Sequence, residues 1–194
     1  MLILASASPR RKLLLERVGV ALTIAPADVD ESVLPDELPL DYVRRVAGAK
    51  AFAHPLPEGA WVLAADTTVE LGGVVFGKAA DADEAAEMLR RLAGHTHHVI
   101  TAVVLRGHDS THTLDVTTAV EMVACDDAVI ADYVASDEWR DKAGAYAVQG
   151  IAAALIHAIH GSITNVIGLP LAEVVALLRS TGAAEVSLAR GLTA

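Results

Sequence analysis

Three cations stand at the start of a predicted helix, where they oppose the local electrostatics. Arg10, Arg11 and Lys12 follow Ser8-Pro9, a pair typical of a helix cap and first helical position. Because a helix N-terminus carries partial positive charge, each cation there is unfavourable by roughly a few tenths of a kcal/mol. A bound phosphate would resolve the conflict, since backbone N–H groups and arginine forks would both point at it. The alternative is a solvated basic helix start, and spacing alone leaves both open.

An aspartate directly follows a strongly apolar segment. Asp66 comes after residues 61–65, which are predicted to form a strand deep in a sheet. A carboxylate near such a strand end is costly unless it binds a metal, a cation or several donors. A polar strand terminus at a sheet edge is the simpler alternative. The acidic residues Asp28, Asp30 and Glu31 could ligate a divalent cation together with Asp66, because magnesium favours carboxylate and phosphate oxygens.

Other residues with catalytic potential give weaker signals. Lys78 is one of only four lysines, but a lone lysine after a hairpin is by default solvated. His95 and His97 would share one face of a strand, and two histidines without a further ligand are more typical of the surface than of a zinc site. Ser162 lacks a nucleophile-elbow sequence and Cys125 lacks a recognisable partner. A covalent nucleophile is therefore not expected.

Composition restricts the classes of partner. The 194 residues are 53% hydrophobic, which is ample for a buried core, and no apolar run approaches the roughly 20 residues of a membrane span. A net charge of −10 and only 4% aromatic residues argue against nucleic-acid binding. The apolar start lacks a basic leader and is expected to be a strand rather than a signal peptide. A single cysteine excludes an internal disulfide and favours a cytoplasmic location.

Alternating strands and helices must position these residues, which predicts an α/β fold with a mixed sheet. Fingerprints of dinucleotide-binding and P-loop proteins are absent. The tail after Gly182 has no strong signal and is expected to fray. Helices are predicted at residues 8–18, 40–53, 81–92, 126–136 and 170–178, and strands at residues 2–5, 22–25, 61–65, 97–105, 111–123, 152–159 and 163–167, with a hairpin turn at residues 72–73.

Taken together, these segments resemble the Maf family of nucleotide pyrophosphatases, which is related in fold to the inosine-triphosphatase group. The order and spacing of the matching motifs cover nearly the whole chain. The motifs are LASASPRR at residues 4–11, VDE at 29–31, AKA at 49–51, ADTTV at 65–69, GK at 77–78, MLRRLAG at 88–94, DKAGAYAVQG at 141–150, and the stretch from GS at 161–162 to GLPL at 168–171.

The resemblance implies one Maf-like domain over residues 1–194, with a twisted mixed sheet flanked by helices and a cleft between two lobes. It implies a divalent-metal-dependent enzyme, using Mg²⁺ or Mn²⁺, that cleaves a nucleoside triphosphate between its α and β phosphates, and it suggests a homodimer. By matching position, Asp66 is the catalytic carboxylate and shares the metal with Glu31. The remaining matches are Ser6, Arg11, Lys50 and Lys78 for substrate binding, and Arg10, Thr67 and Gln149 for substrate choice.

The motif details are similar to the dTTP/UTP branch of the family, with a house-cleaning role in the nucleotide pool. Gln149 offers a donor and an acceptor side by side, which complements the imide edge of uracil or thymine. The sister branch, which acts on 7-methyl-GTP, usually has a glutamate there and a tryptophan after the proline. Ala79, Val148 and Ile163 depart from the family pattern. The 7-methyl-GTP activity, and a nucleotide-binding regulator of septum formation with little turnover, are the alternatives.

Overall fold

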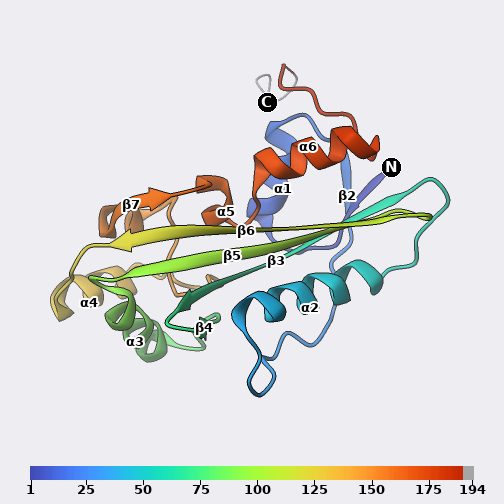
Figure 1. Cartoon of the computed structure of the whole chain (residues 1–194). Helices are drawn as coiled ribbons and strands as arrows, with labels where there is room; N and C mark the ends of the chain where they lie inside the picture. Colours follow the sequence, from blue (N-terminus) through green and yellow to red (C-terminus); the bar gives the residue numbers. More distant parts are fainter. Residues whose placement is uncertain (190–194) are drawn as a thin grey trace.

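One seven-stranded mixed sheet lies at the centre of the molecule (Figure 1). The computed structural model describes residues 1–189. The strand order is β2-β1-β3-β5-β6-β7, and β4 pairs with β3. Strand β1 runs parallel to β2 and β3, and the other pairs are antiparallel. The strands are β1 (Leu2–Leu4), β2 (Leu22–Ile24), β3 (Trp61–Leu71), β4 (Val74–Phe76), β5 (Thr96–Arg106), β6 (Thr111–Met122) and β7 (Ile156–His160).

Helices cover both faces of the sheet. Figure 1 shows α1, α5 and α6 on one side of the long strands, and α2, α3 and α4 on the other. Three apolar clusters fill the space between the layers. The helices are α1 (Pro9–Arg17), α2 (Pro39–Phe52), α3 (Ala82–Leu92), α4 (Asp127–Ala135), α5 (Ile163–Ile167) and α6 (Leu171–Thr181), with a short 3₁₀ helix, η1 (Ile151–Leu155).

Strand β3 is buried on both faces, so its alternation distributes side chains between two cores. Leu63 and Ala65 pack with α1 and α6, whereas Val62 and Ala64 pack with α2. Burying one such leucine stabilises the fold by about 1.5–3 kcal/mol. Continuing the alternation places Asp66 on the α2 side and the next residue, Thr67, on the α1 side. Two adjacent polar residues therefore serve opposite faces of the sheet.

The predicted α/β class with a mixed sheet is confirmed, and three local predictions are wrong. Residues 163–167 form helix α5 rather than a strand, because the Ser162 hydroxyl caps the N–H of Asn165 and Gly168 ends the turn with φ 125°. Strand β7 begins at Ile156, after the 3₁₀ turns of η1. Short apolar runs fit either a strand or a buried helix, which explains both errors. Strand β3 continues to Leu71, so Asp66 lies inside it.

The C-terminal segment is packed further than expected. Ala183 is buried, and the N–H of Ser187 donates to the carbonyl of Val18 at 2.9 Å. The expected fraying therefore does not apply to residues 183–187, and the part of that prediction that concerns residues 190–194 lies outside the described residues. Within residues 1–189, no helix combines the length and hydropathy that a membrane span requires. The two-lobe division stays a prediction.

Candidate active site

A break in the sheet opens beside the middle of β3. Strand β1 pairs with residues 61–63 of β3, and β4 pairs with residues 69–71. The other edge of β3 pairs with β5 without interruption from Val62 to Glu70. A cavity of about 770 Å³ lies at this break. It is lined by all nine predicted site residues, namely Ser6, Arg10, Arg11, Glu31, Lys50, Asp66, Thr67, Lys78 and Gln149. Their roles remain predictions.

Two carboxylates converge on a lysine at one side of the cavity. Lys50, in the last turn of α2, places its Nζ 2.7 Å from Asp66 Oδ1 and 2.7 Å from Glu31 Oε1. Lys50 is 7% exposed and Asp66 5%. Burial raises the pKa of Asp66, and the charges of Lys50 and Arg11 counteract part of that rise. Burial also acts to raise the pKa of Glu31, but the hydrogen bond and charge of Lys50 hold it below its ordinary value.

Arg11 is held in place by three hydrogen bonds. Its Nε donates to the carbonyl of Gly168 at 2.8 Å, its Nη1 to Ser6 Oγ at 3.0 Å and its Nη2 to Thr67 Oγ1 at 3.0 Å. Burial lowers the pKa of Arg11, and the nearby Asp66 carboxylate acts in the opposite direction. A guanidinium has five N–H donors, so two remain for a ligand. The group is a fixed, buried cation with two donors available.

Ser6 is prepared to donate a hydrogen bond. Its Oγ accepts from the Ser8 N–H at 3.2 Å and from Arg11 Nη1 at 3.0 Å. A hydroxyl has two acceptor lone pairs and one proton, so only the proton remains available. Together with Arg11, Ser6 therefore offers donors alone to this part of the cavity, which is the pattern that an anion requires.

The three cations of the first helix divide between the cavity and solvent. Arg10 lines the cavity, and its Nε donates to the carbonyl of Ile167 at 3.3 Å. Burial lowers the pKa of Arg10, whereas Asp141 raises it. Lys12 forms an exposed pair with Glu16 at 3.6 Å, so it does not belong to the site. The carbonyls of Ile167 and Gly168, at the C-terminal end of α5, thus bind both arginines. This position suits cations, because the C-terminal end of a helix carries partial negative charge.

Lys78 and Gln149 are exposed residues that also line the cavity. The backbone of Lys78 forms an isolated antiparallel β-bridge with that of Ala143, and the N–H of Gly144 donates to the carbonyl of Gly77 at 3.0 Å. The charge of Lys78 also lowers the pKa of Glu31. The residues after β4 are therefore tied to the segment of residues 141–150, and Lys78 faces the same cavity as Arg11 and Asp66.

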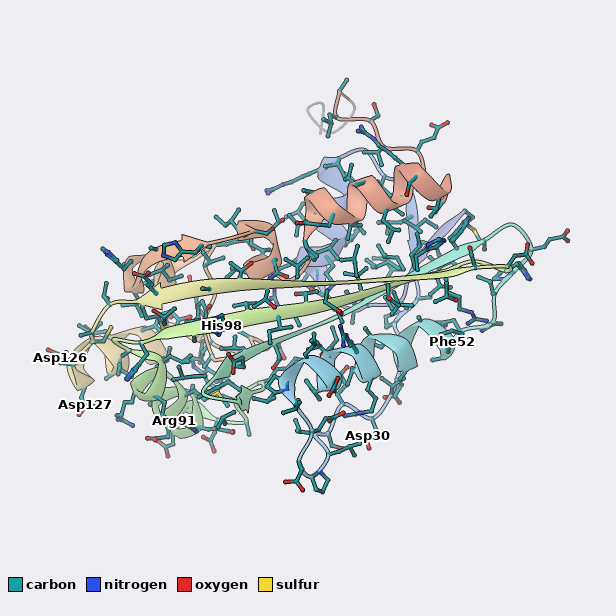
Figure 2. All side chains as sticks on the ribbon, viewed as in Figure 1. Asp30, Phe52, Arg91, His98, Asp126 and Asp127 are labelled. Atoms are coloured by element: carbon teal, nitrogen blue, oxygen red, sulfur yellow. The ribbon has the colours of Figure 1, made fainter. Side chains whose placement is uncertain are left out.

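The acidic loop contributes less than its sequence suggested. Asp28 and Asp30 are absent from the cavity lining, and only Glu31 reaches it. Figure 2 shows Asp30 on the loop between β2 and α2, where its Oδ1 accepts from the Ser32 N–H at 2.9 Å. Of the three acidic residues that could join Asp66, Asp28 and Asp30 therefore lie outside the cavity lining. The reason is local, because Asp30 satisfies its own turn.

Several cavity residues were missed from the sequence. Asp141 and Ala145 adopt φ of 60° and 59°, a left-handed conformation that is uncommon for residues other than glycine. Such backbone conformations cluster at functional sites. Both belong to the segment 141–150, which brings Asp141, Lys142 and Tyr146, but not Ala145 itself, into the cavity lining. The DKAGAYAVQG motif was the available signal, but these φ angles follow from the packing of the segment rather than from its composition.

His97 is buried rather than exposed, which corrects the interpretation of the histidines. It is 0% exposed, and its Nε2 lies 2.8 Å from the hydroxyl of Tyr146. Burial lowers the pKa of His97 to about 4, so the ring is neutral near pH 7. The neighbouring His98, labelled in Figure 2, is half-exposed. Its Nδ1 lies 2.6 Å from Glu70 Oε1. His97 therefore contacts Tyr146, which lines the cavity.

The paired carboxylates fit a divalent cation that a ligand helps to bind. Glu31 and Asp66 both lie within hydrogen-bond distance of one point, the Lys50 nitrogen. Mg²⁺ is usually held by one or two carboxylates, with phosphate oxygens and waters completing its coordination. Among residues 1–189, no group of three or more His, Cys, Asp or Glu side chains could hold an ion. The donor set therefore suits a metal whose remaining ligands come from a phosphate.

The chain is similar to known proteins over nearly its whole length. The family model described as "Maf-like protein" matches residues 1–181. The chain belongs to the Maf family. A dTTP/UTP pyrophosphatase of Anaeromyxobacter dehalogenans is 53% identical over 185 residues, covering 93% of this Maf chain and 94% of the relative. The dTTP/UTP pyrophosphatase of Roseobacter denitrificans is 48% identical over 184 residues, covering 94% of this chain and 97% of its own.

Solved structures similar to this Maf protein are more distant. A HAM1 protein from Coxiella burnetii matches with a TM-score of 0.49 and 15% identity, covering 92% of this chain and 98% of that chain. A dITP/XTP pyrophosphatase from Mycobacterium abscessus matches with a TM-score of 0.39 and 16% identity, covering 62% of this chain and 73% of that chain.

Proposed function

We propose that this Maf protein is a metal-dependent nucleoside-triphosphate pyrophosphatase that hydrolyses dTTP and UTP to the monophosphate and pyrophosphate. The relatives named dTTP/UTP pyrophosphatase, at 53% and 48% identity over most of the chain, support the reaction and the substrate class. The observation that carries the proposal is the meeting of Arg11, Lys78 and the Glu31–Lys50–Asp66 group in one cavity. An acidic protein thereby concentrates positive charge where a triphosphate would bind.

In the proposed mechanism, donors on one side of the cavity hold the phosphates. Arg11 offers two N–H groups and Ser6 its hydroxyl proton, while Lys78 adds a further cation to the lining of the same cavity. Electrostatic stabilisation of this kind dominates phosphoryl transfer, because negative charge spreads over several oxygens in the transition state. These cations neutralise the departing pyrophosphate. Glu31 and Asp66 would hold the metal, which supplies Lewis-acid stabilisation of phosphate charge.

Asp66 is the proposed general base. Its carboxylate accepts the proton of a water molecule that attacks the α phosphorus, and the bond to the bridging oxygen of pyrophosphate breaks. Burial makes Asp66 more basic than a solvated aspartate, because it raises the pKa of the carboxyl group. Lys50 keeps the group within hydrogen-bond distance of a cation at 2.7 Å, so the carboxylate stays ionised and oriented. The two effects together give a charged base that is itself shielded from solvent.

We also propose that Gln149, at the rim of the cavity, recognises the nucleobase. Its amide offers a donor and an acceptor, which complement the imide edge of uracil and thymine. Nucleoside triphosphates are cytoplasmic metabolites, so we propose a cytoplasmic, nucleotide-pool house-cleaning role. We propose a homodimer that uses Mg²⁺ or Mn²⁺, and no nucleic-acid partner, in line with the net charge of −10.

A substrate panel tests the proposed function. Pyrophosphate release is measured from UTP, dTTP, CTP, GTP and 7-methyl-GTP, with Mg²⁺, Mn²⁺ or a chelator. The expected result is metal-dependent release that is fastest with UTP or dTTP. Preference for 7-methyl-GTP would instead assign the sister activity. Binding of UTP without any release would favour a nucleotide-binding regulator and contradict the enzyme.

A further inference from the structure

The hydroxyl of Thr67 has no capacity left for a substrate. Its Oγ1 lies 3.0 Å from Arg11 Nη2, 2.8 Å from Thr101 Oγ1 and 3.2 Å from the carbonyl of Gly168. A hydroxyl provides one donor and two acceptor sites. Thr67 donates to Gly168 and accepts from Arg11 and Thr101, which uses all three. A nucleobase or phosphate therefore finds no free hydrogen-bonding site on this side chain.

The direction of the Thr67–Thr101 hydrogen bond follows from counting partners. Thr101 is 0% exposed, and Thr67 is the only hydrogen-bond partner of its hydroxyl within residues 1–189. If Thr67 were the donor, the proton of Thr101 would be buried without an acceptor, which is unfavourable. Thr101 therefore donates and Thr67 accepts. The two residues lie directly opposite each other on β5 and β3, on the face that meets α1.

We propose that Thr101, which lies behind the cavity, is a positioning residue for Arg11, and that Thr67 acts on substrate through Arg11 rather than by contact. The hydroxyl of Thr101 fixes Thr67, and Thr67 fixes the Nη2 edge of the guanidinium. Because Nε and Nη1 are already bonded to Gly168 and Ser6, this third bond completes the orientation of the planar group. The inference rests on the proposed function, in which Arg11 holds phosphate.

Calorimetric binding of inorganic pyrophosphate tests this inference without requiring turnover. Thr101→Val keeps the shape of the side chain and removes the hydroxyl, whereas Thr101→Ser keeps the hydroxyl. We expect T101V to weaken pyrophosphate binding by about tenfold and T101S to bind nearly as the wild type, because the hydrogen bond that fixes Thr67, and through Thr67 the Arg11 guanidinium, is lost only in the first. In the assay with UTP, T101V should raise KM by a similar factor with a smaller change in kcat. Thr101→Ala carries the same test if T101V does not fold.

A double-mutant cycle with Arg11→Lys separates positioning from general destabilisation. If Thr101 acts through Arg11, T101V should weaken pyrophosphate binding less than about twofold in the R11K background, because a lysine lacks the fork that Thr67 orients. An undiminished effect in that background overturns the inference, as does a T101V variant that binds pyrophosphate like the wild type. A wild type that fails to bind pyrophosphate also overturns it. Failure of the proposed function is distinguishable, since it would be pyrophosphate binding without release from UTP or dTTP.

Discussion

Replacing Lys50 by methionine removes the ammonium group that neutralises Glu31 and Asp66. Methionine keeps most of the aliphatic volume of the side chain, so the substitution tests charge more than packing. Asp66 is 5% exposed and loses its hydrogen-bonded cation, whereas Glu31 is exposed and can turn to solvent. Removing one partner of a buried ion pair costs about 3–5 kcal/mol of the free energy of unfolding. We expect K50M to lose an amount in that range near pH 8.

The loss should shrink in acid, because Asp66 can take up a proton. Burial already raises the pKa of Asp66, and removal of the Lys50 charge raises it further. A carboxyl group whose folded pKa exceeds its unfolded value, 3.8, binds more protons when folded, so stability falls as pH rises between the two values. The slope in that window approaches about 1.4 kcal/mol per pH unit. K50M should therefore be closer to the wild type at pH 5 than at pH 8.

Urea unfolding at pH 5, 6.5 and 8 measures this difference. Lys12→Met is the matched control, because Lys12 lies in an exposed pair with Glu16 and should change stability by less than about 1 kcal/mol. Adding Asp66→Asn to K50M should recover most of the loss by removing the uncompensated charge. If K50M and K12M destabilise the protein equally, or the K50M deficit is independent of pH, the buried charge pair is not an important contributor to stability.

Two further predictions concern the walls of the cavity. His97 has a folded pKa of about 4, against an ordinary value of 6.5. Between these two values the unfolded chain binds one more proton than the folded protein. The free energy of unfolding should therefore fall by about 3 kcal/mol as pH drops from about 6.5 to 4. His97→Gln should lack this component, which urea midpoints between pH 7.5 and 4 would reveal; parallel pH profiles for both proteins contradict the assignment. Gln149→Glu should lower kcat/KM for UTP at least about tenfold, because a carboxylate cannot donate to an imide carbonyl. An unchanged kcat/KM would mean that Gln149 does not contact the base.

The sequence predicted which residues line the candidate cavity better than it predicted the contacts that hold them in place. Asp66 and Arg11 conflict with their local surroundings, one as a carboxylate in an apolar strand and the other as a cation at a helix start, and such conflicts mark functional positions. Both line the cavity together with the other predicted residues. Helix boundaries were predicted well where a cap was present, as at Ser8 and Asp81, whose side chains accept from the N–H groups of Arg11 and Glu84.

The remaining features depend on contacts between segments that are distant in sequence. His97 is hydrogen-bonded to Tyr146, and the proposed role of Thr101 depends on both Thr67 and Arg11, which come from separate elements. Residues 163–167 are apolar enough for a strand, and the Ser162 cap becomes evident only once the chain turns onto β5. Composition does not encode these pairings, so pattern reasoning could place the segments but not their partners.

Asp66→Asn provides the most direct test of the central claim. The variant keeps the size of the side chain and removes the proposed base, while Arg11, Ser6 and Lys78, the proposed phosphate-binding groups, are unchanged. UTP binding by calorimetry and pyrophosphate release from UTP are measured side by side for the variant and the wild type. The proposed mechanism predicts that binding is retained within about tenfold while release falls by at least about a hundredfold. Release at the wild-type rate would show that the buried carboxylate is not the base.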